Sequence, residues 1–356
     1  MSEDRLLLRD YHPRSQLKVQ ERHLHRPKFP AIDFHAHFAD FYCPLYAGNG
    51  LWAPPDIPLV VETLREQGIR RIVNLDGFWD GFFGLSQEKI LDIFQRWGDF
   101  FTTFVSINTD LAREPGFEKY VRNHLCRARE LGARGVKLFK HVSIMRQQPD
   151  GTYAPGRNLL IDDERLGVIW ATAAELKFPV LAHIADPTAF FEPVDERNER
   201  YLELRAHPDW SFHEKTYTFG ELMEAQCNLL ARNPDTTFVI PHVGSHAEDL
   251  AFVSDCLRRY PNLYVDIAAR IDELGRQPYT ARAFFLDHPD RILFGTDAFT
   301  ETVGWLYKSY FRFLETYDEY FPCGNFHAYG IGLPDDVLEK VYCKNALRVL
   351  GETGMG

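Results

Sequence analysis

The pattern that most constrains this chain is an alternation of short apolar runs with longer amphipathic segments. Eight apolar runs cover residues 31–35, 71–75, 101–107, 134–139, 179–183, 237–241, 262–266 and 291–295. Most are rich in Val, Ile, Leu or Phe, which is typical of strands covered on both faces. Segments with helical periodicity separate most of them, at 59–67, 118–131, 163–176, 218–233 and 247–260. Repeated strand–helix units predict an α/β fold with a parallel sheet, and eight of them close into a (β/α)8 TIM barrel.

An open doubly wound sheet is the rival architecture. It needs a reversal of strand order, and no Gly-x-Gly-x-x-Gly phosphate loop follows any of the eight runs. The 356 residues are enough for a barrel of about 250 residues with insertions. We therefore expect an N-terminal arm over 1–29 and a barrel over 30–356. Two long aromatic insertions, 184–217 and 298–332, should cap the carboxyl-end face of the barrel and set substrate choice.

Composition and charge exclude several kinds of partner. The net charge is −11 and no basic stripe is present, which argues against nucleic acid and anionic membranes. No apolar stretch approaches the roughly 18 residues of a spanning helix, and the polar N-terminus lacks a secretory apolar core. The six cysteines are scattered without a Cys-x-x-Cys pair, so we expect reduced thiols in a cytoplasmic protein. A small-molecule substrate is the expected partner, and a homo-oligomer remains open.

Polar residues that bind metals or move protons end four of the apolar runs. His35 and His37 lie two apart at the end of the first run, so they share one face of a strand. His183, His242 and Asp297 end the fifth, sixth and eighth runs. All strand carboxyl ends meet at one mouth of a barrel, so these five side chains should converge there. Histidines with a carboxylate suit zinc, manganese or iron(II).

These residues resemble the amidohydrolase superfamily. The sequence around them is more similar to its amidohydrolase-related branch. That branch contains aminocarboxymuconate-semialdehyde decarboxylase and other metal-dependent decarboxylases and hydrolases. The resemblance runs from about residue 30 to 351. It implies that one divalent metal is held by four ligands, His35, His37, His183 and Asp297. Zinc is the first choice of metal, with manganese or iron as alternatives. It also implies that His242 is a catalytic acid, base or carbonyl polariser, and Asp297 can accept a proton from an activated water.

Three further residues are candidates for binding substrate. Lys137 is an ionisable residue within the fourth run; we expect a plain ammonium near the mouth rather than a carboxylated bridge between two metals. Arg270 follows the seventh run and could hold a substrate carboxylate, although a surface ion pair fits equally well. His246 lies one helical turn beyond His242 and is expected to face the mouth.

The reaction that fits these residues first is metal-dependent hydrolysis of an amide, lactone or ester bond. The alternative is metal-dependent, non-oxidative decarboxylation of an aromatic or unsaturated carboxylic acid, because the same groups could polarise that substrate. A third hypothesis is a barrel that has lost catalysis and serves as a binding protein. It predicts broken ligand positions, whereas all five positions are intact here.

Overall fold

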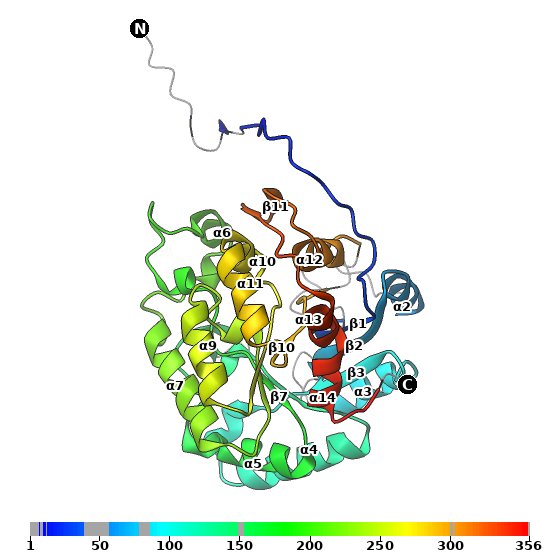
Figure 1. Cartoon of the computed structure of the whole chain (residues 1–356). Helices are drawn as coiled ribbons and strands as arrows, with labels where there is room; N and C mark the ends of the chain where they lie inside the picture. Colours follow the sequence, from blue (N-terminus) through cyan, green and yellow to red (C-terminus); the bar gives the residue numbers. More distant parts are fainter. Residues whose placement is uncertain are drawn as a thin grey trace.

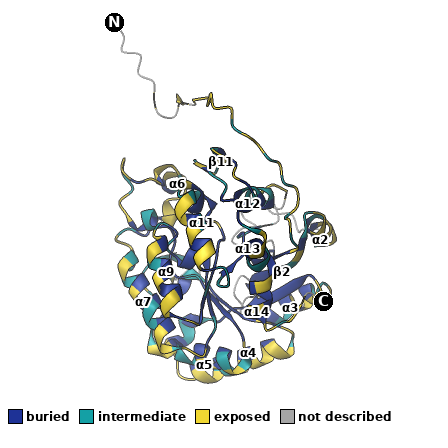
Figure 2. Ribbon diagram, in the orientation of Figure 1, coloured by how far each residue is buried: buried dark blue, intermediate teal, exposed yellow. Residues whose placement is uncertain are grey.

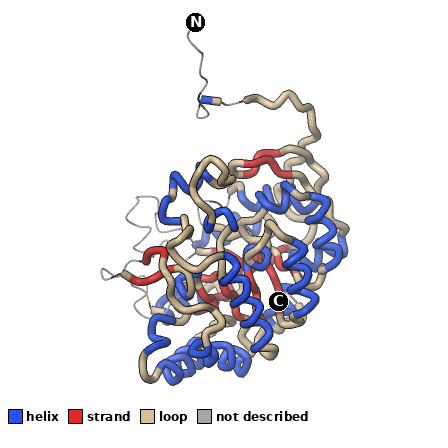
Figure 3. The backbone as a smooth tube through the Cα atoms, turned by 90° about the vertical axis from the view of Figure 1, so that its left-hand side faces the viewer, coloured by secondary structure: helices blue, strands red, loops and turns tan. Residues whose placement is uncertain are grey.

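A parallel eight-stranded sheet forms the centre of the molecule. The computed structural model describes residues 7, 10–11, 13–38, 57–77, 86–148, 153–299, 302 and 304–354. In spatial order the strands are β1 (Ala31–Ala36), β2 (Ile69–Gly77), β3 (Phe101–Val105), β4 (Val136–Leu138), β7 (Val180–Ala182), β8 (Phe238–Ile240), β9 (Leu263–Asp266) and β10 (Ile292–Leu293). Figure 3 shows these strands surrounded by helices. The order follows the sequence without reversal, as a barrel requires and a doubly wound sheet does not.

Backbone hydrogen bonds close the ring between its first and last strands. The amide of Asp297 donates to the carbonyl of His35 at 2.8 Å, and the amide of His37 donates to the carbonyl of Ala298 at 2.8 Å. Ala36 and Ala298 also form a parallel bridge. The (β/α)8 barrel predicted from the sequence is therefore confirmed. The eighth predicted strand is shorter than expected, because its last residues bond to β1 beyond the regular ladder.

Helices cover the outside of the ring and connect its strands (Figure 1). The longer ones are α2 (Ile57–Glu66), α3 (Gln87–Gln95), α4 (Phe117–Glu130), α5 (Gly167–Leu176), α7 (Phe219–Arg232), α9 (Leu250–Arg259), α11 (Pro278–Asp287) and α12 (Leu306–Glu315). The shorter ones are α6 (Tyr201–Ala206), α8 (Pro241–Gly244), α10 (Ile271–Arg276), α13 (Asp335–Glu339), a π-helical turn (Lys340–Lys344) and α14 (Asn345–Leu350). Figure 2 shows their buried faces turned toward the sheet. Among the described residues, no helix combines the length and apolarity needed to cross a membrane.

Apolar side chains fill both faces of the sheet. One cluster lies between the strands and the helices, and a second fills the barrel interior with residues such as Ile32, Phe34 and Leu181. Residues of α14 join the inner cluster, among them Ala346 and Leu350. Burial on both faces explains why the strands read as near-continuous apolar runs in the sequence.

A β-bulge in β1 lets both apolar and polar residues of this strand face the interior. Asp33 pairs with Ile72 and Ala36 pairs with Asn74, so β1 holds one more residue than β2 over this stretch. An extra residue shifts the in-and-out alternation by one position. Phe34 therefore belongs to the inner cluster, and beyond the bulge the two histidines of the His-x-His pair also face inward.

The two insertions lie together at the upper end of the molecule in Figure 1, where α6, α10, α12 and β11 are neighbours. The second insertion contains α12 and a hairpin, β11 (Phe321–Cys323) and β12 (Phe326–Ala328). A second hairpin, β5 (Met145–Gln147) and β6 (Tyr153–Pro155), follows β4. Many insertion rings are core: Tyr307 and Tyr310 are buried, whereas Trp305 is exposed.

The arm also contacts the C-terminal elements. Its Arg22 pairs with buried Asp318 at 2.8 Å, and the amide of Lys28 donates to Glu315. The described part of the arm that precedes Arg22 leads away from the body (Figure 1).

Candidate metal and catalytic site

The end of β1 supplies two histidines whose ring nitrogens are oriented by buried carboxylates. Nδ1 of His35 lies 2.8 Å from Oδ2 of Asp266, and Nδ1 of His37 lies 2.7 Å from Oδ1 of Asp76. A carboxylate accepts, so each Nδ1 carries the proton and each Nε2 presents a lone pair. Metal-binding histidines are usually oriented in this way.

Asp297 meets both lone pairs at the mouth of the barrel. Its Oδ1 lies 3.4 Å from Nε2 of His35 and 3.2 Å from Nε2 of His37. With this assignment of protons, three acceptor atoms face one another and repel unless a cation lies between them. Burial lowers the pKa of His35, which favours its neutral form. The donor set therefore fits a divalent metal.

This group is a possible metal site. Within the described ranges, His35, His37 and Asp297 are the set of at least three His, Cys, Asp or Glu residues whose ligand atoms all lie within 4.8 Å of one another. They come from opposite ends of the chain and meet because β10 closes against β1. The convergence expected from the strand ends is thus present for these three residues.

His242 adjoins the group and is neutral. Its ring centroid lies 5.1 Å from that of His35. Its Nδ1 lies 2.8 Å from the carbonyl oxygen of Ala268, which can only accept, so Nδ1 carries the proton and Nε2 is a proton acceptor. This Nε2 is buried without a hydrogen-bond partner in the described part of the chain. Burial, reinforced by the charge of Arg270, lowers the pKa of His242 well below 6.5.

This tautomer favours the base among the roles expected for His242 from the sequence, which were acid, base and carbonyl polariser. Stabilising an oxyanion would require a proton on Nε2, whereas the neutral ring found here has a lone pair there. A base that first accepts a proton and then returns it fits the geometry better.

Strained backbone surrounds these side chains. His242, Val243 and Ser245 have φ angles of 58°, 59° and 64°, and Ala269 and Asp297 have φ angles of 51° and 62°. Non-glycine residues pay roughly 1–2 kcal/mol each in this left-handed region. Such strain gathers at functional sites, where the surrounding structure holds it in place. The left-handed turn directs His242 inward directly after β8.

His183 is close to the site but is not a member of the metal group. Its ring centroid lies 4.6 Å from that of His242, while its Nε2 lies 3.3 Å from Oδ1 of Asp186. Asp186 in turn accepts from Nζ of Lys140 at 2.8 Å. Burial lowers the pKa of His183 to about 4, so the ring is neutral. Ligation by His183 stays a prediction.

Two of the three expected substrate-binding residues lie beside this cluster. Lys137 is buried, with Nζ 5.3 Å from the ring centroid of Phe139, and its charge lowers the pKa of both His35 and His183. Arg270 is buried next to His242, and its Nη1 donates to the carbonyl of Ala269 at 2.6 Å.

The ring of His246, which is expected from its spacing to face the mouth, packs against two phenylalanines. Its ring contacts Phe219 of α7 at 4.7 Å and Phe252 of α9 at 5.4 Å. These contacts are with the helical layer.

Sequence reasoning did not identify Asp266 and Asp33 as parts of the site. Asp266 ends β9 and accepts from the ring of His35 and from the backbone amides of His242 and Ala268, both at 3.0 Å. Asp33 accepts from the amide of His35 and from the side chains of Thr296 and Tyr307. Burial outweighs these donors and raises the pKa of Asp33 to about 7. The only available signal was a carboxylate within or at the end of an apolar run.

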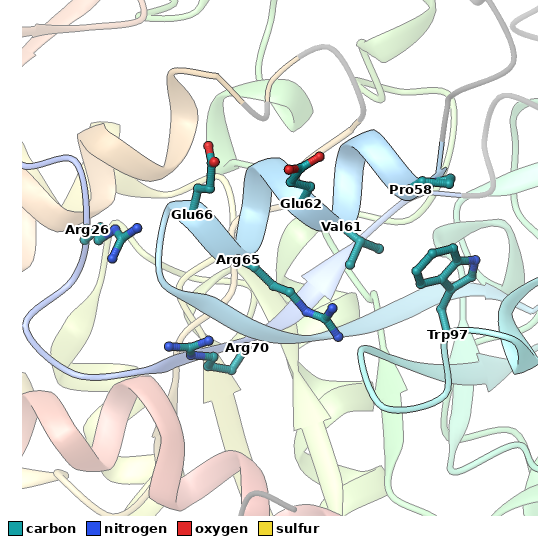
Figure 4. Close-up of a pocket in the computed structure, with 8 residues that line it drawn as sticks. All are labelled: Arg26, Pro58, Val61, Glu62, Arg65, Glu66, Arg70 and Trp97. Carbon is teal, nitrogen blue, oxygen red and sulfur yellow. The ribbon is translucent and has the colours of Figure 1, made fainter.

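A hollow on the outside of the barrel is separate from this site. It has a volume of about 510 Å³ beside α2, and its lining combines the cations Arg26, Arg65 and Arg70 with acidic residues of the helix (Figure 4). Arg70 lies at the start of β2, whereas Asp76, the partner of His37, lies near its end, about 20 Å further along an extended strand. We therefore assign this hollow no part in the chemistry.

The chain belongs to the amidohydrolase family. The sequence profile of that family matches residues 103–351, most of the chain. This match confirms the resemblance to the superfamily and its amidohydrolase-related branch. Members are generally metal-dependent, consistent with the possible metal site described above. Among curated proteins no match was found.

Solved structures with a similar fold include an uncharacterised barrel protein and two decarboxylases. An uncharacterised TIM-barrel protein of Bordetella bronchiseptica is 18% identical, with 90% of this chain and 98% of that chain covered and a TM-score of 0.55. A 2,6-dihydroxybenzoate decarboxylase from Rhizobium is 16% identical over 91% and 99% of the two chains, with a TM-score of 0.51. A 5-carboxyvanillate decarboxylase from Sphingomonas paucimobilis is 13% identical over 92% and 100%, with a TM-score of 0.55. At these identities the likeness concerns the fold alone.

Proposed function

We propose that this protein is a metal-dependent hydrolase that cleaves an amide, lactone or ester bond in a small molecule. The observation that carries the proposal is the convergence of three unprotonated ligand atoms, from His35, His37 and Asp297, beside the neutral acceptor nitrogen of His242. Hydrolysis needs a base that removes a proton from water, and a neutral buried imidazole supplies one.

The metal would be held by His35, His37 and Asp297, with His183 as the fourth ligand and zinc as the first choice. A catalytic metal in such a site lowers the pKa of water and polarises a carbonyl. His183 fits this role because its ring is neutral and adjoins the cluster, although its Nε2 must turn from Asp186. One metal needs no bridging group, so we also propose that Lys137 is an unmodified ammonium.

The chain's own residues would move the proton in two stages. Nε2 of His242 accepts a proton from the attacking water, and the hydrogen bond from its Nδ1 to Ala268 keeps the ring oriented. The resulting imidazolium then returns the proton to the leaving nitrogen or oxygen. Asp297 is the second acid–base group, because its carboxylate also faces the reaction centre. Lys137 and Arg270 would bind an anionic part of the substrate.

Decarboxylation of an aromatic acid is the second candidate, and the ring environment of His37 favours it. Phe299 stacks on this ring at 5.6 Å, and Phe139 lies 6.3 Å away. Aromatic walls with two nearby cations suit a flat carboxylic acid, which is also the kind of substrate named for two of the fold neighbours. We place it second because decarboxylation needs a proton donor to carbon, whereas neutral His242 is an acceptor.

Isotope labelling distinguishes the two reactions. The zinc-loaded protein is incubated in water enriched in oxygen-18 and deuterium with panels of lactones, esters, amides and aromatic acids. Hydrolysis incorporates oxygen-18 into the product. Decarboxylation instead releases carbon dioxide and leaves deuterium on the product carbon. Turnover of aromatic acids alone, without oxygen-18 in the product, would contradict the hydrolase proposal.

Replacing His242 tests its role as the base. His242→Ala should retain the metal and lose activity by about 10²–10⁴-fold, the usual contribution of one acid–base group. His23→Ala, in the exposed arm, is the control and should retain both. Loss of metal from His242→Ala, measured by elemental analysis, would show instead that His242 is a ligand.

A further inference from the structure

Two cysteines of the helical layer lie face to face. Cys227 of α7 and Cys256 of α9 have their Sγ atoms 3.9 Å apart, within hydrogen-bond distance for sulfur. They are 29 positions apart in the sequence, so only the packing of α7 against α9 brings them together. A disulfide has an S–S bond of about 2.05 Å, so the two sulfurs need to approach by about 2 Å. Among the cysteines that the structure describes, no other pair of sulfur atoms lies within hydrogen-bond distance.

The two thiols differ in exposure and in acidity. Cys227 is half-buried, while Cys256 is buried. Hydrogen bonding from Cys256 lowers the pKa of the Cys227 thiol to about 6, with smaller contributions from Tyr260 and Arg259 that burial partly opposes. The same pairing and burial raise the pKa of Cys256. The thiolate is the nucleophilic form of cysteine, and an accessible acidic thiol beside a second thiol is the usual arrangement for reversible oxidation.

We propose that Cys227 and Cys256 form a peroxide-sensitive thiol pair that closes into an intramolecular disulfide between α7 and α9. This site is separate from the metal centre and does not depend on the proposed hydrolase activity. Cys227 is the attacking residue because it is the more exposed of the two, and Cys256 is the resolving residue because it faces Cys227 from the neighbouring helix.

The reaction balances with a hydroperoxide as the oxidant. The Cys227 thiolate attacks one peroxide oxygen; an S–O bond forms, the O–O bond breaks, and the departing oxygen takes up a proton. The Cys256 thiol then loses its proton and attacks the sulfenic sulfur of Cys227. The S–S bond forms, the S–O bond breaks, and hydroxide leaves with that proton as water. With hydrogen peroxide, two thiols and one peroxide give one disulfide and two waters.

The position of the pair links it to the proposed active site through the backbone. The chain between the two cysteines contains β8 and the left-handed turn of His242. A disulfide would therefore close a loop around the segment that directs His242 inward.

Peptide mapping of the full-length protein tests the proposal. The protein is treated with increasing hydrogen peroxide, free thiols are blocked with N-ethylmaleimide, and unreduced peptides are examined by mass spectrometry. We expect one linked species that joins the peptides of Cys227 and Cys256, with loss of two thiols per chain. Oxidation of other cysteines without this linked species would overturn the proposal.

Serine variants separate the two roles, and exposed Cys126 of α4 provides the matched control. Cys227→Ser should abolish the disulfide. Cys256→Ser should stop the reaction at a sulfenic acid on Cys227, which dimedone traps. Cys126→Ser should form the linked species as the unaltered protein does. If dimedone labels Cys256 in Cys227→Ser but does not label Cys227 in Cys256→Ser, the assignment of attacking and resolving residues is wrong. The peptide map of the wild-type protein tests the proposal even if a variant fails to fold.

Discussion

Replacing Asp266 by asparagine should switch the tautomer of His35 and weaken metal binding. Oδ1 of Asp266 accepts the backbone amides of His242 and Ala268, while Oδ2 accepts Nδ1–H of His35. An asparagine that keeps its oxygen toward the two amides must turn its NH2 group toward Nδ1. His35 can then accept that hydrogen bond only if its proton moves to Nε2, the atom that would bind the metal.

The magnitudes decide which way the asparagine turns. The opposite orientation would keep the His35 tautomer but place NH2 against two buried amide donors. Leaving these two donors unsatisfied costs about 1–3 kcal/mol each, or about 2–6 kcal/mol together. Losing the carboxylate behind a metal-binding histidine typically weakens metal affinity by about 10–100-fold, equivalent to about 1.4–2.7 kcal/mol. The orientation that preserves the backbone hydrogen bonds is therefore favoured. The substitution should then lower the affinity for the metal and leave the backbone hydrogen bonds intact.

Competition with a chromophoric chelator measures the effect directly. We expect Asp266→Asn to bind zinc about 10–100-fold more weakly than the unaltered protein, with little change in the free energy of unfolding of the metal-free form. Asp290→Asn is the matched control, because Asp290 pairs with Lys340 and Arg348 away from the site. Equal zinc affinity in Asp266→Asn and the unaltered protein would refute this reasoning about the tautomer.

Three further predictions concern stability, each measured by urea unfolding. Arg200→Met should lower the free energy of unfolding by about 3–5 kcal/mol, because it leaves buried Glu273 without its cation. Lys28→Met, which breaks an exposed pair with Asp335, should cost less than about 1 kcal/mol. Burial lowers the pKa of His141 to about 4, below the 6.5 of the unfolded chain, so stability falls as pH drops from 6.5 to 4. His141→Gln should reduce that fall by up to about 3 kcal/mol; unchanged pH dependence would contradict it.

The architecture could be predicted because barrel strands are buried on both faces and therefore appear as continuous apolar runs. All eight predicted strands are present within a few residues of their expected positions. Two of the predicted helices begin several residues later than expected: α5 begins at Gly167, after a 3-10 turn at Glu164–Leu166, rather than at 163, and α9 begins at Leu250 rather than at 247. Asp163 caps the 3-10 turn before α5 and Asp249 caps α9, and a periodicity does not resolve helix starts to within one or two residues.

The site was predictable only to the extent that it depends on strand ends. His35, His37 and Asp297 meet because a closed barrel forces β1 and β10 together. The bulge in β1 and the left-handed turn at His242 depend on tertiary contacts. No residue pattern in the sequence therefore predicted either feature. The spacing of His246 from His242 was a poor guide for the same reason: it assumes a regular helix, whereas the intervening backbone is left-handed.

A single carboxylate explains how the strained turn and the metal group can coexist. Asp266 holds the amide of His242 and the ring of His35 with its two oxygens, so it fixes the turn and the histidine tautomer at once. The ring of His242 is held in turn by the carbonyl of Ala268, whose amide also donates to Asp266. The acceptor nitrogen of His242 and the lone pair of His35 are therefore oriented by one buried group. A change at Asp266 should then alter metal binding and base orientation together, whereas a change at Asp76 acts through the ring of His37 and should alter metal binding.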